Sequence, residues 1–213
     1  SQIPIVVMPM GPNGETKVWL LHNLGADYTL DPHTPVVGLQ GGYIQWGRRG
    51  PTGDSRDTWQ TAGNTSNFAA APTATDANEL AITGWDQTKA ADGAWNSGTE
   101  ANPLRVPTMT EWTALTANNT PSRTGTFSNN STNYGAALHY GDTTTPKKIT
   151  LPAAGYRRYI GSGELMNRGS AGWYWSSTEA NANARALTFG GTNVNAGANA
   201  SRDYGFSLRC IAE

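Results

Sequence analysis

The sequence is poor in cysteine, in charge and in long apolar runs, and each shortage removes a class of protein. Cys210 is the single cysteine among 213 residues, so no disulfide framework exists within the chain. Charged residues make up only 15% and the net charge is -1, so no overall field attracts nucleic acid. No apolar run reaches the roughly 18 residues of a spanning helix, so we expect no membrane insertion.

What replaces charge is a mixture of Thr, Asn, Ser, Gly and Ala. Because Asn, Ser and Thr side chains compete for backbone hydrogen bonds, this composition favours turns and strands over long helices. The length suits one domain, residues 1–213, with a loop-rich insertion at about 31–102. Residues 1–4 show neither a signal peptide nor an initial Met, so we expect a processed or trimmed chain.

Local signals predict several secondary-structure elements. Residues 3–8 and 17–21 predict a hairpin around a Gly-Pro-Asn-Gly turn. Thr108 and Glu111 fit a capping box, which predicts a helix ending near Asn118. We further expect a short helix at 76–82, a polar loop at 122–133, and strands at 136–140, 147–151, 155–160, 173–177, 185–189 and 204–211.

The insertion and the last strand carry the aromatic evidence for packing. Trp46, Trp59, Trp85 and Trp95 indicate that the insertion packs onto the body, because each ring buries a large apolar area. In the segment 204–211, bulky residues alternate with Gly, Ser and Arg, so we expect burial with a period of two. Cys210 falls on the buried side of this pattern, where an inert thiol is favoured over a reactive one.

The segment 172–211 combines a bulky frame with small polar residues. The frame contains Trp175, expected in the core, and Trp173 and Tyr174, for which burial and exposure both stay open. Between its parts, Asn, Arg, Ser and Asp are separated mostly by Ala and Gly. An ordinary hydrophilic loop is one interpretation, and a binding face whose side chains are free to change is the other.

Five blocks carry a family resemblance. They are VWLLHNL at 18–24, LRVPT at 104–108 followed by Glu111-Trp112, LPAAGYR at 151–157, YWSSTE at 174–179 and YGFSLRC at 204–210. In this order they resemble the Fibrobacter succinogenes major paralogous domain family, which is common on bacterial surface proteins. The resemblance implies an α+β, C-type-lectin-like fold of the formylglycine-generating-enzyme-like subtype, with mixed, mostly antiparallel sheets, about two helices and long packed loops.

The chain departs from the family at one position. Members often carry a Cys-Pro pair before the Arg-x-Pro-Thr block, and that Cys pairs with the one near the C-terminus. Asn102-Pro103 stands there instead and Leu104 replaces the usual aromatic residue, which leaves Cys210 unpaired. A narrower resemblance is to the variable proteins of diversity-generating retroelements, in which adenine-directed mutagenesis scatters Asn codons toward Ser, Thr, Asp, Gly, Ala and Tyr.

Enzymatic and metal chemistry find little support. The formylglycine-generating relatives depend on two cysteines, and the widely spaced His22, His33 and His139 predict no nucleophile with its base. The sugar-binding signatures of calcium-dependent lectins are absent, and no Asp-x-Asp-x-Asp loop occurs. We therefore expect no enzyme and no cofactor, with a structural calcium ion as the open alternative.

The hypothesis is a ligand-binding variable protein, of receptor or adhesin type, that recognises a protein or a glycan. Its setting would be a bacterial cell surface or a phage particle, where it would serve in receptor binding. The alternative is a structural or adhesive module of a surface fibre without a variable ligand. The expected ligand-binding residues are Trp173, Tyr174, Asn181, Asn183, Arg185, Asn193, Asn195, Asn199, Arg202 and Asp203.

Overall fold

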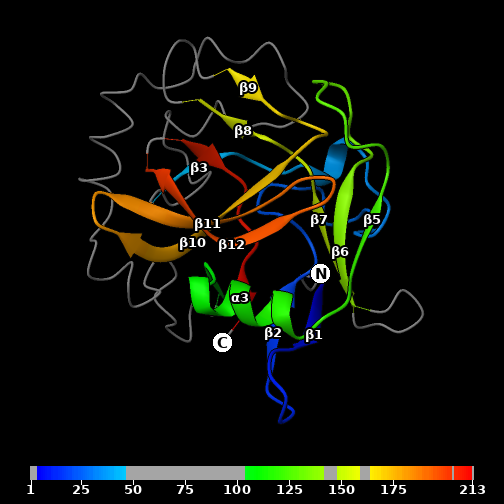
Figure 1. The fold of residues 1–213 in the computed structure, drawn as a ribbon. Coiled ribbons are helices and arrows are strands. Elements are labelled where there is room, and N and C mark those ends of the chain that lie inside the picture. Colours follow the sequence, from blue (N-terminus) through cyan, green and yellow to red (C-terminus); the bar gives the residue numbers. More distant parts are fainter. Residues whose placement is uncertain (1–3, 47–103, 142–147, 159–163, 203, 213) are drawn as a thin grey trace.

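A computed structural model describes residues 4–46, 104–141, 148–158, 164–202 and 204–212. These residues form four small sheets, paired antiparallel throughout, and one α-helix, which confirms a mostly antiparallel α+β architecture (Figure 1). The short helix expected at 76–82 and the rings of Trp59, Trp85 and Trp95 lie outside the described residues.

The first sheet joins both ends of the chain. Its strand order is β1 (Ile5–Pro9), β2 (Thr16–Leu20), β14 (Ile211–Ala212) and β4 (Leu104–Arg105). The predicted hairpin is confirmed, since β1 and β2 pair along their full length. Gly14 closes the turn with a φ of 84°, a left-handed conformation that glycine adopts without strain.

Helix α3 (Met109–Ala117) begins where the sequence predicts it. The Thr108 side chain accepts from the Glu111 amide and the Glu111 side chain accepts from the Thr108 amide, so the capping box is confirmed. Trp112 faces inward and its ring centre lies 5.0 Å from that of Trp19. The helix thereby packs against the first sheet, which contains Trp19.

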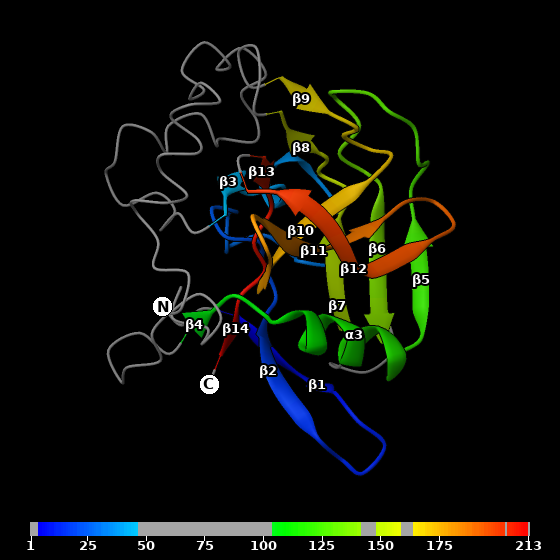
Figure 2. The ribbon, with the colours of Figure 1, turned by 60° about the vertical axis from the view of Figure 1, so that its left-hand side comes forward.

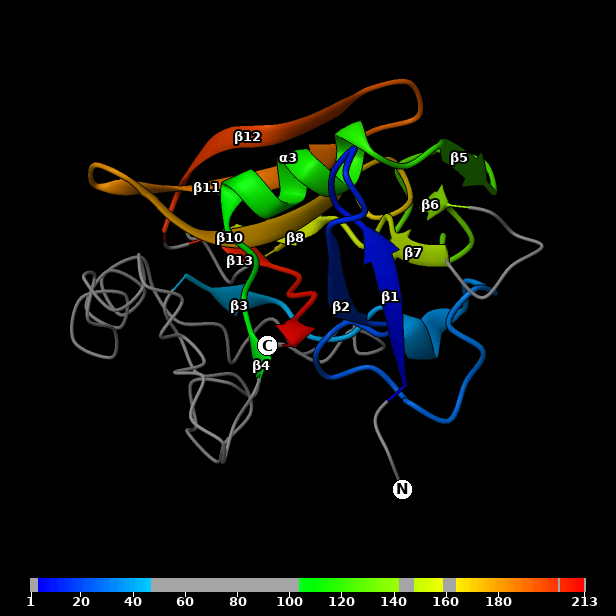
Figure 3. The same ribbon diagram turned by 90° about the horizontal axis from the view of Figure 1, so that it is seen from below.

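The central sheet contains β10 (Gly172–Ala180), β11 (Asn183–Phe189) and β12 (Val194–Ser201) in that order. It lies above α3 in Figure 2, and β12 forms its outer edge (Figure 3). The strand β12 was not predicted. Val194–Ser201 is rich in Asn, Ala and Gly, and its strand conformation comes from pairing with β11.

Two further sheets flank the central one. The first contains β5 (Pro121–Thr124), β6 (Ala137–Gly141) and β7 (Lys148–Pro152) in that order. The polar loop predicted at 122–133 is therefore wrong at its start, because Ser122 to Thr124 pair with β6. Their side chains are mostly exposed, so no apolar pattern marked the strand.

The last sheet has the order β3 (Ile44–Gln45), β13 (Gly205–Phe206), β8 (Tyr156–Arg157) and β9 (Leu165–Met166). The single strand predicted at 204–211 is wrong. The chain leaves this sheet after Phe206 and joins the sheet of β1, β2 and β4 at Ile211. The four residues from Ser207 to Cys210, which connect the two sheets, are all buried. The period-two burial expected there does not occur.

Two hydrophobic clusters lie on opposite faces of the central sheet. Adjacent residues of a strand point to opposite faces, so Tyr174 joins the cluster around Trp112, whereas Trp175 joins the one around Phe206. Trp175 is buried as predicted, and its Nε1 donates to the Ile44 carbonyl at 2.7 Å. Rings on both faces thus fix the position of the central sheet.

Candidate functional site

The turn between β10 and β11 is held from within the protein. Asn181 adopts a φ of 56°, which Asn tolerates better than other residues with a Cβ. The Arg202 guanidinium donates to the carbonyls of Asn181 at 2.7 Å and of Asn183 at 3.1 Å. Arg202 is only 5% exposed, and its burial lowers the pKa of the guanidinium against an opposing effect of Glu179. Arg202 therefore holds the turn in place and offers little surface to a ligand.

Three of the expected residues gather on one face of the outer strands. Asn183 pairs with Ser201 and Arg185 pairs with Asn199, and residues in register share a face. The Asn183 amide donates to the Asn199 side-chain oxygen at 2.8 Å, and Arg185 reaches the Gly197 carbonyl at 3.4 Å. Asn199 is exposed, whereas Asn183 and Arg185 are half-buried. This cluster is polar and open to solvent at the edge of the sheet.

Asn193 and Asn195 lie at the other end of β12, and both are exposed. Asn193 is the last residue of the loop between β11 and β12. Asn195 precedes a bulge, where Ala196 and Gly197 oppose one residue of β11, and its side chain accepts from the Gly197 amide at 3.0 Å. The seven residues of β11 span about 23 Å, and Asn181 lies beyond one end of this strand while Asn193 and Asn195 lie near the other. The expected residues therefore run along the sheet and do not form one compact patch, because the bulge leaves Asn195, paired with Thr188, on the face opposite to Asn199, which pairs with Arg185.

Tyr174 does not belong to an exposed face. Its side chain is fully buried, its hydroxyl donates to the Pro152 carbonyl at 2.8 Å, and Asn23 donates to it at 3.1 Å. Burial raises the pKa of the hydroxyl, so Tyr174 stays neutral. The two alternatives left open for Trp173 and Tyr174 resolve differently, since Trp173 is half-buried. Asp203 lies outside the described residues.

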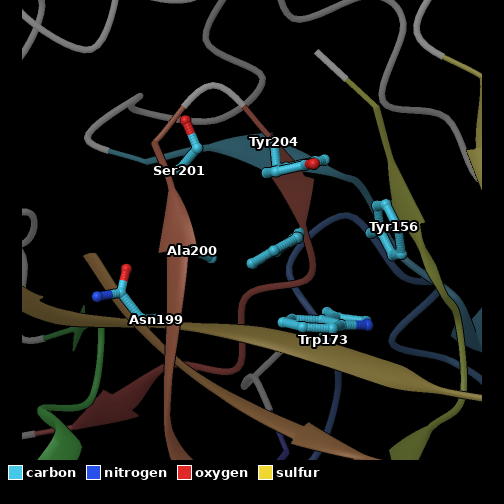
Figure 4. A pocket seen from close by; sticks show the side chains of 7 residues that line it. Tyr156, Trp173, Asn199, Ala200, Ser201 and Tyr204 are labelled. Atoms are coloured by element: carbon cyan, nitrogen blue, oxygen red, sulfur yellow. The ribbon is translucent and has the colours of Figure 1, made fainter. Parts of the chain in front are cut away.

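A pocket opens beside the polar cluster, on the other face of β12 (Figure 4). Its volume is about 220 Å³, and aromatic rings make most of its wall. The lining residues are Tyr156, Trp173, Asn199, Ala200, Ser201, Tyr204 and Phe206. The buried Trp173 Nε1 has no hydrogen-bond partner among the described residues, so an indole N–H is left unsatisfied near this wall. The pocket and the polar cluster share Asn199 and together form the candidate site.

Five pocket residues are not among the expected ligand-binding residues. Tyr204 and Phe206 belong to the bulky frame, Tyr156 comes from a distant block, and Ala200 and Ser201 belong to the small residues between the parts of the frame. The sequence signal that would have indicated them is the density of aromatic residues. The rings that border the pocket are selected by long-range strand pairing. The pairing of β13 with β8 brings Tyr204 and Phe206 beside Tyr156.

The described residues offer no obvious reactive constellation. No group of three His, Cys, Asp or Glu side chains there is placed to hold a metal ion. His33 and His139 both contact the Thr150 hydroxyl, at 2.8 and 2.7 Å, in a buried polar chain away from the candidate site. Among the helices described, none has the length and apolar character needed to cross a bilayer.

Comparison with known proteins returned no family model, no curated protein and no solved structure that matches the chain. The site is therefore interpreted from its own geometry.

Proposed function

We propose that the protein is a ligand-binding variable protein, which recognises a protein or a glycan through the outer side chains of β11 and β12 on a C-type-lectin-like scaffold. One observation carries the proposal. The exposed side chains of Asn193, Asn195 and Asn199 take little part in holding the sheet, whereas buried rings and the backbone ladder hold it. Such positions tolerate exchange, and exchange is what a diversified binding face requires.

Two details of the scaffold support this separation. β12 packs against the helix through its backbone, because a Cβ added to Gly197 would lie 3.0 Å from the Met109 sulfur. Its inward side chains are the small Ala198 and Ala200, both buried. The strand path is thus fixed by residues other than the exposed asparagines.

The recognition surface we propose is smaller than the set expected from the sequence. It contains Trp173 at the pocket and the polar side chains of β11 and β12, whereas Tyr174 and Arg202 support it from inside. The members are Trp173, Asn183, Arg185, Asn193, Asn195, Asn199 and Ser201. We further propose that the protein is displayed on a bacterial surface or a phage particle and that it binds its ligand without catalysing a reaction.

The test is made on genes, because diversification leaves a record there. We expect closely related copies of the gene to differ mainly at the codons of Asn193, Asn195 and Asn199. We also expect a near-identical copy of the segment 172–211 beside a reverse-transcriptase gene. Differences spread evenly over buried and exposed codons, with no second copy of the segment, would favour the structural fibre module and contradict the proposal.

A protein-level test complements the genetic one. A phage-displayed library randomised at these three codons is selected on a defined protein and on a defined glycan. We expect folded binders that differ from one another only at the exposed positions. As a matched control, a library randomised at the buried Ala186, Ala198 and Ala200 is expected to yield mostly unfolded protein and no binders.

A further inference from the structure

Arg185 is the charged side chain of the polar cluster on the outer strands. It is half-buried, and Asn199 of β12 is its cross-strand neighbour on the same face of the sheet. Its Nη1 donates to the Gly197 carbonyl at 3.4 Å, which is long for a hydrogen bond. A guanidinium has five N–H donors, so most donors of Arg185 have no acceptor among the described residues.

The carboxylates of the neighbouring elements do not neutralise Arg185. Glu179 of β10 pairs with Ala184, which belongs to the buried cluster on the other face of the sheet. Glu111 of α3 binds Arg105 through both carboxylate oxygens. Within the described part of the chain, no carboxylate forms an ion pair with Arg185. An unpaired guanidinium on an open face selects a planar carboxylate, which it binds through two parallel hydrogen bonds.

The asparagine beside Arg185 adds neutral donors. The Asn183 amide nitrogen donates to the Asn199 side-chain oxygen at 2.8 Å, so Asn199 Nδ2 keeps its two N–H groups for a ligand. Asn199 is exposed, and the Cβ atoms of a cross-strand pair lie about 5 Å apart. A single carboxylate placed between Arg185 and Asn199 therefore receives hydrogen bonds from both side chains. One guanidinium balances one negative charge, which suits a carboxylate better than a doubly charged phosphate.

The outer edge of β12 indicates what carries the carboxylate. Ser207 exchanges backbone hydrogen bonds with Trp173 and Trp175, so these residues of β10 point away from β11. Ladder bonds alternate along each strand, and the register of the sheet then directs the amide and carbonyl of Asn199 away from β11. Neither group has a hydrogen-bond partner among the described residues. An outward amide and carbonyl on one residue are what the backbone of an extended peptide binds.

This free edge is short. On one side lies the bulge, where the Gly197 amide already donates to a side chain of its own strand. On the other side the Ser201 carbonyl accepts from the Tyr204 amide. An added strand therefore pairs at Asn199, and the residue paired there projects its side chain onto the face that carries Arg185. Its backbone lies two strand spacings, about 10 Å, from that of Arg185, a distance that an Arg and a Glu side chain span together.

We propose that β12 binds an extended acidic segment of a protein ligand, whose backbone pairs with Asn199 and whose carboxylate is bound by Arg185 and the Asn199 amide. The inference rests on the proposed function and names the chemistry of its ligand. Arg185 is not among the three codons expected to vary. The preference for an acidic segment is therefore expected in every copy, whereas a change at Asn199 modulates it.

The test compares two peptides of nearly the same shape. Acetyl-Thr-Val-Glu-Val-Thr-amide carries one carboxylate, and its Gln analogue carries none. Each is titrated into the protein at low salt while the Asn199 backbone amide and the Arg185 Nε–H signals are followed by NMR. We expect the Glu peptide to bind with a Kd on the order of 1 mM and the Gln peptide at least about fivefold more weakly. Equal affinities, or no binding of either peptide up to roughly 20 mM, would overturn the proposal.

Variants assign the selection to Arg185. In Arg185→Gln the cation is lost, so the Glu peptide is expected to bind as weakly as the Gln peptide. Arg158→Gln is the matched control, because it removes the same charge from an ion pair with Glu164, and both affinities should stay unchanged. Asn199→Asp places a negative charge beside the bound carboxylate, so it weakens the Glu peptide alone. If Arg185→Gln does not fold, Asn199→Asp decides, and an unchanged ratio of the two affinities contradicts the site.

A further arm distinguishes the source of the carboxylate. Methyl galacturonoside and methyl galactoside are titrated in the same way. If the uronate binds more tightly than the Glu peptide, the site selects an acidic glycan and the peptide proposal is contradicted. Failure of every arm leaves the gene test of the proposed function intact, because diversified codons do not depend on the charge of the ligand. Failure of the gene test leaves the selection of the Glu peptide to be judged by itself.

Discussion

The guanidinium carbon of Arg202 lies 4.3 Å from the centre of the Trp46 ring, so a buried cation covers a buried indole at the base of the central sheet. The same guanidinium donates to the carbonyls of Asn181 and Asn183. Arg202 therefore connects the β10–β11 turn to the core cluster that contains Trp46 and Trp175. A position that the sequence placed among the changeable residues is in fact a structural support.

Replacing Arg202 with Ala is expected to lower the free energy of unfolding by about 3 kcal/mol, because two charge-assisted hydrogen bonds and a cation–π contact are lost together. Urea unfolding measures the change. Arg185→Ala, on the same sheet with one hydrogen bond of 3.4 Å, is the matched control and is expected to cost less than about 1 kcal/mol. Similar costs for the two variants would contradict the assigned role of Arg202.

Asn181 is expected to tolerate few replacements, although it is exposed. Its φ of 56° lies in the left-handed region, which β-branched residues avoid. We expect Asn181→Val to destabilise the protein by about 1–2 kcal/mol and Asn181→Gly to be nearly neutral. Thermal unfolding of the two variants checks the difference. If Val is accepted as well as Gly, the turn does not depend on its backbone conformation.

Acid is expected to destabilise the protein through His139. Burial, together with the nearby charges of Lys148 and His33, lowers its pKa from 6.5 to about 4. The unfolded chain thus takes up a proton first, so the stabilisation is complete above about pH 6.5 and is lost as pH falls toward 4. Urea unfolding between pH 7 and about 5, where carboxylates titrate little, measures the slope.

A His139→Asn variant is expected to show a shallower loss of stability over the same pH range. Part of the slope should remain, because burial also lowers the pKa of His33, which shares the Thr150 hydroxyl with His139. An unchanged slope in the variant would show that His139 does not carry the effect.

Cys210 is expected to be inert in the folded protein. It is buried and unpaired, and burial raises the pKa of its thiol to about 12, so almost no thiolate exists at neutral pH. A colourimetric thiol reagent at pH 8 should react with the chain only after unfolding in urea. Rapid reaction of the native protein would contradict the buried position of Cys210.

How much the sequence reveals depends on how local the signal is. The hairpin of β1 and β2 and the capping box of α3 are written within a few residues, so both were predicted correctly. The strand β12 was not, because Asn, Ala and Gly have little preference for strands and only the neighbouring β11 imposes that conformation. The segment 204–211 carried a strand pattern, yet it divides between two sheets that its local sequence does not specify.

The candidate site shows the same limit. Exposed asparagines at 193, 195 and 199 were identified from composition, since small polar residues between Ala and Gly seldom build a core. The aromatic pocket was not, because Tyr156, Trp173 and Phe206 come from three separate strands. Their meeting depends on long-range pairing, which one sequence does not display.

The separation between a fixed sheet and exchangeable outer side chains is tested most directly by one combined variant, Asn193→Ser, Asn195→Asp and Asn199→Tyr, whose free energy of unfolding is compared with that of the original chain. We predict cooperative unfolding and a change within about 1 kcal/mol, because these side chains are exposed and form two surface hydrogen bonds with the described part of the chain. The single change Ala186→Asn, inside the same sheet, is expected to cost more than about 2 kcal/mol. A loss above about 3 kcal/mol in the triple variant, or a gradual transition, would contradict the account.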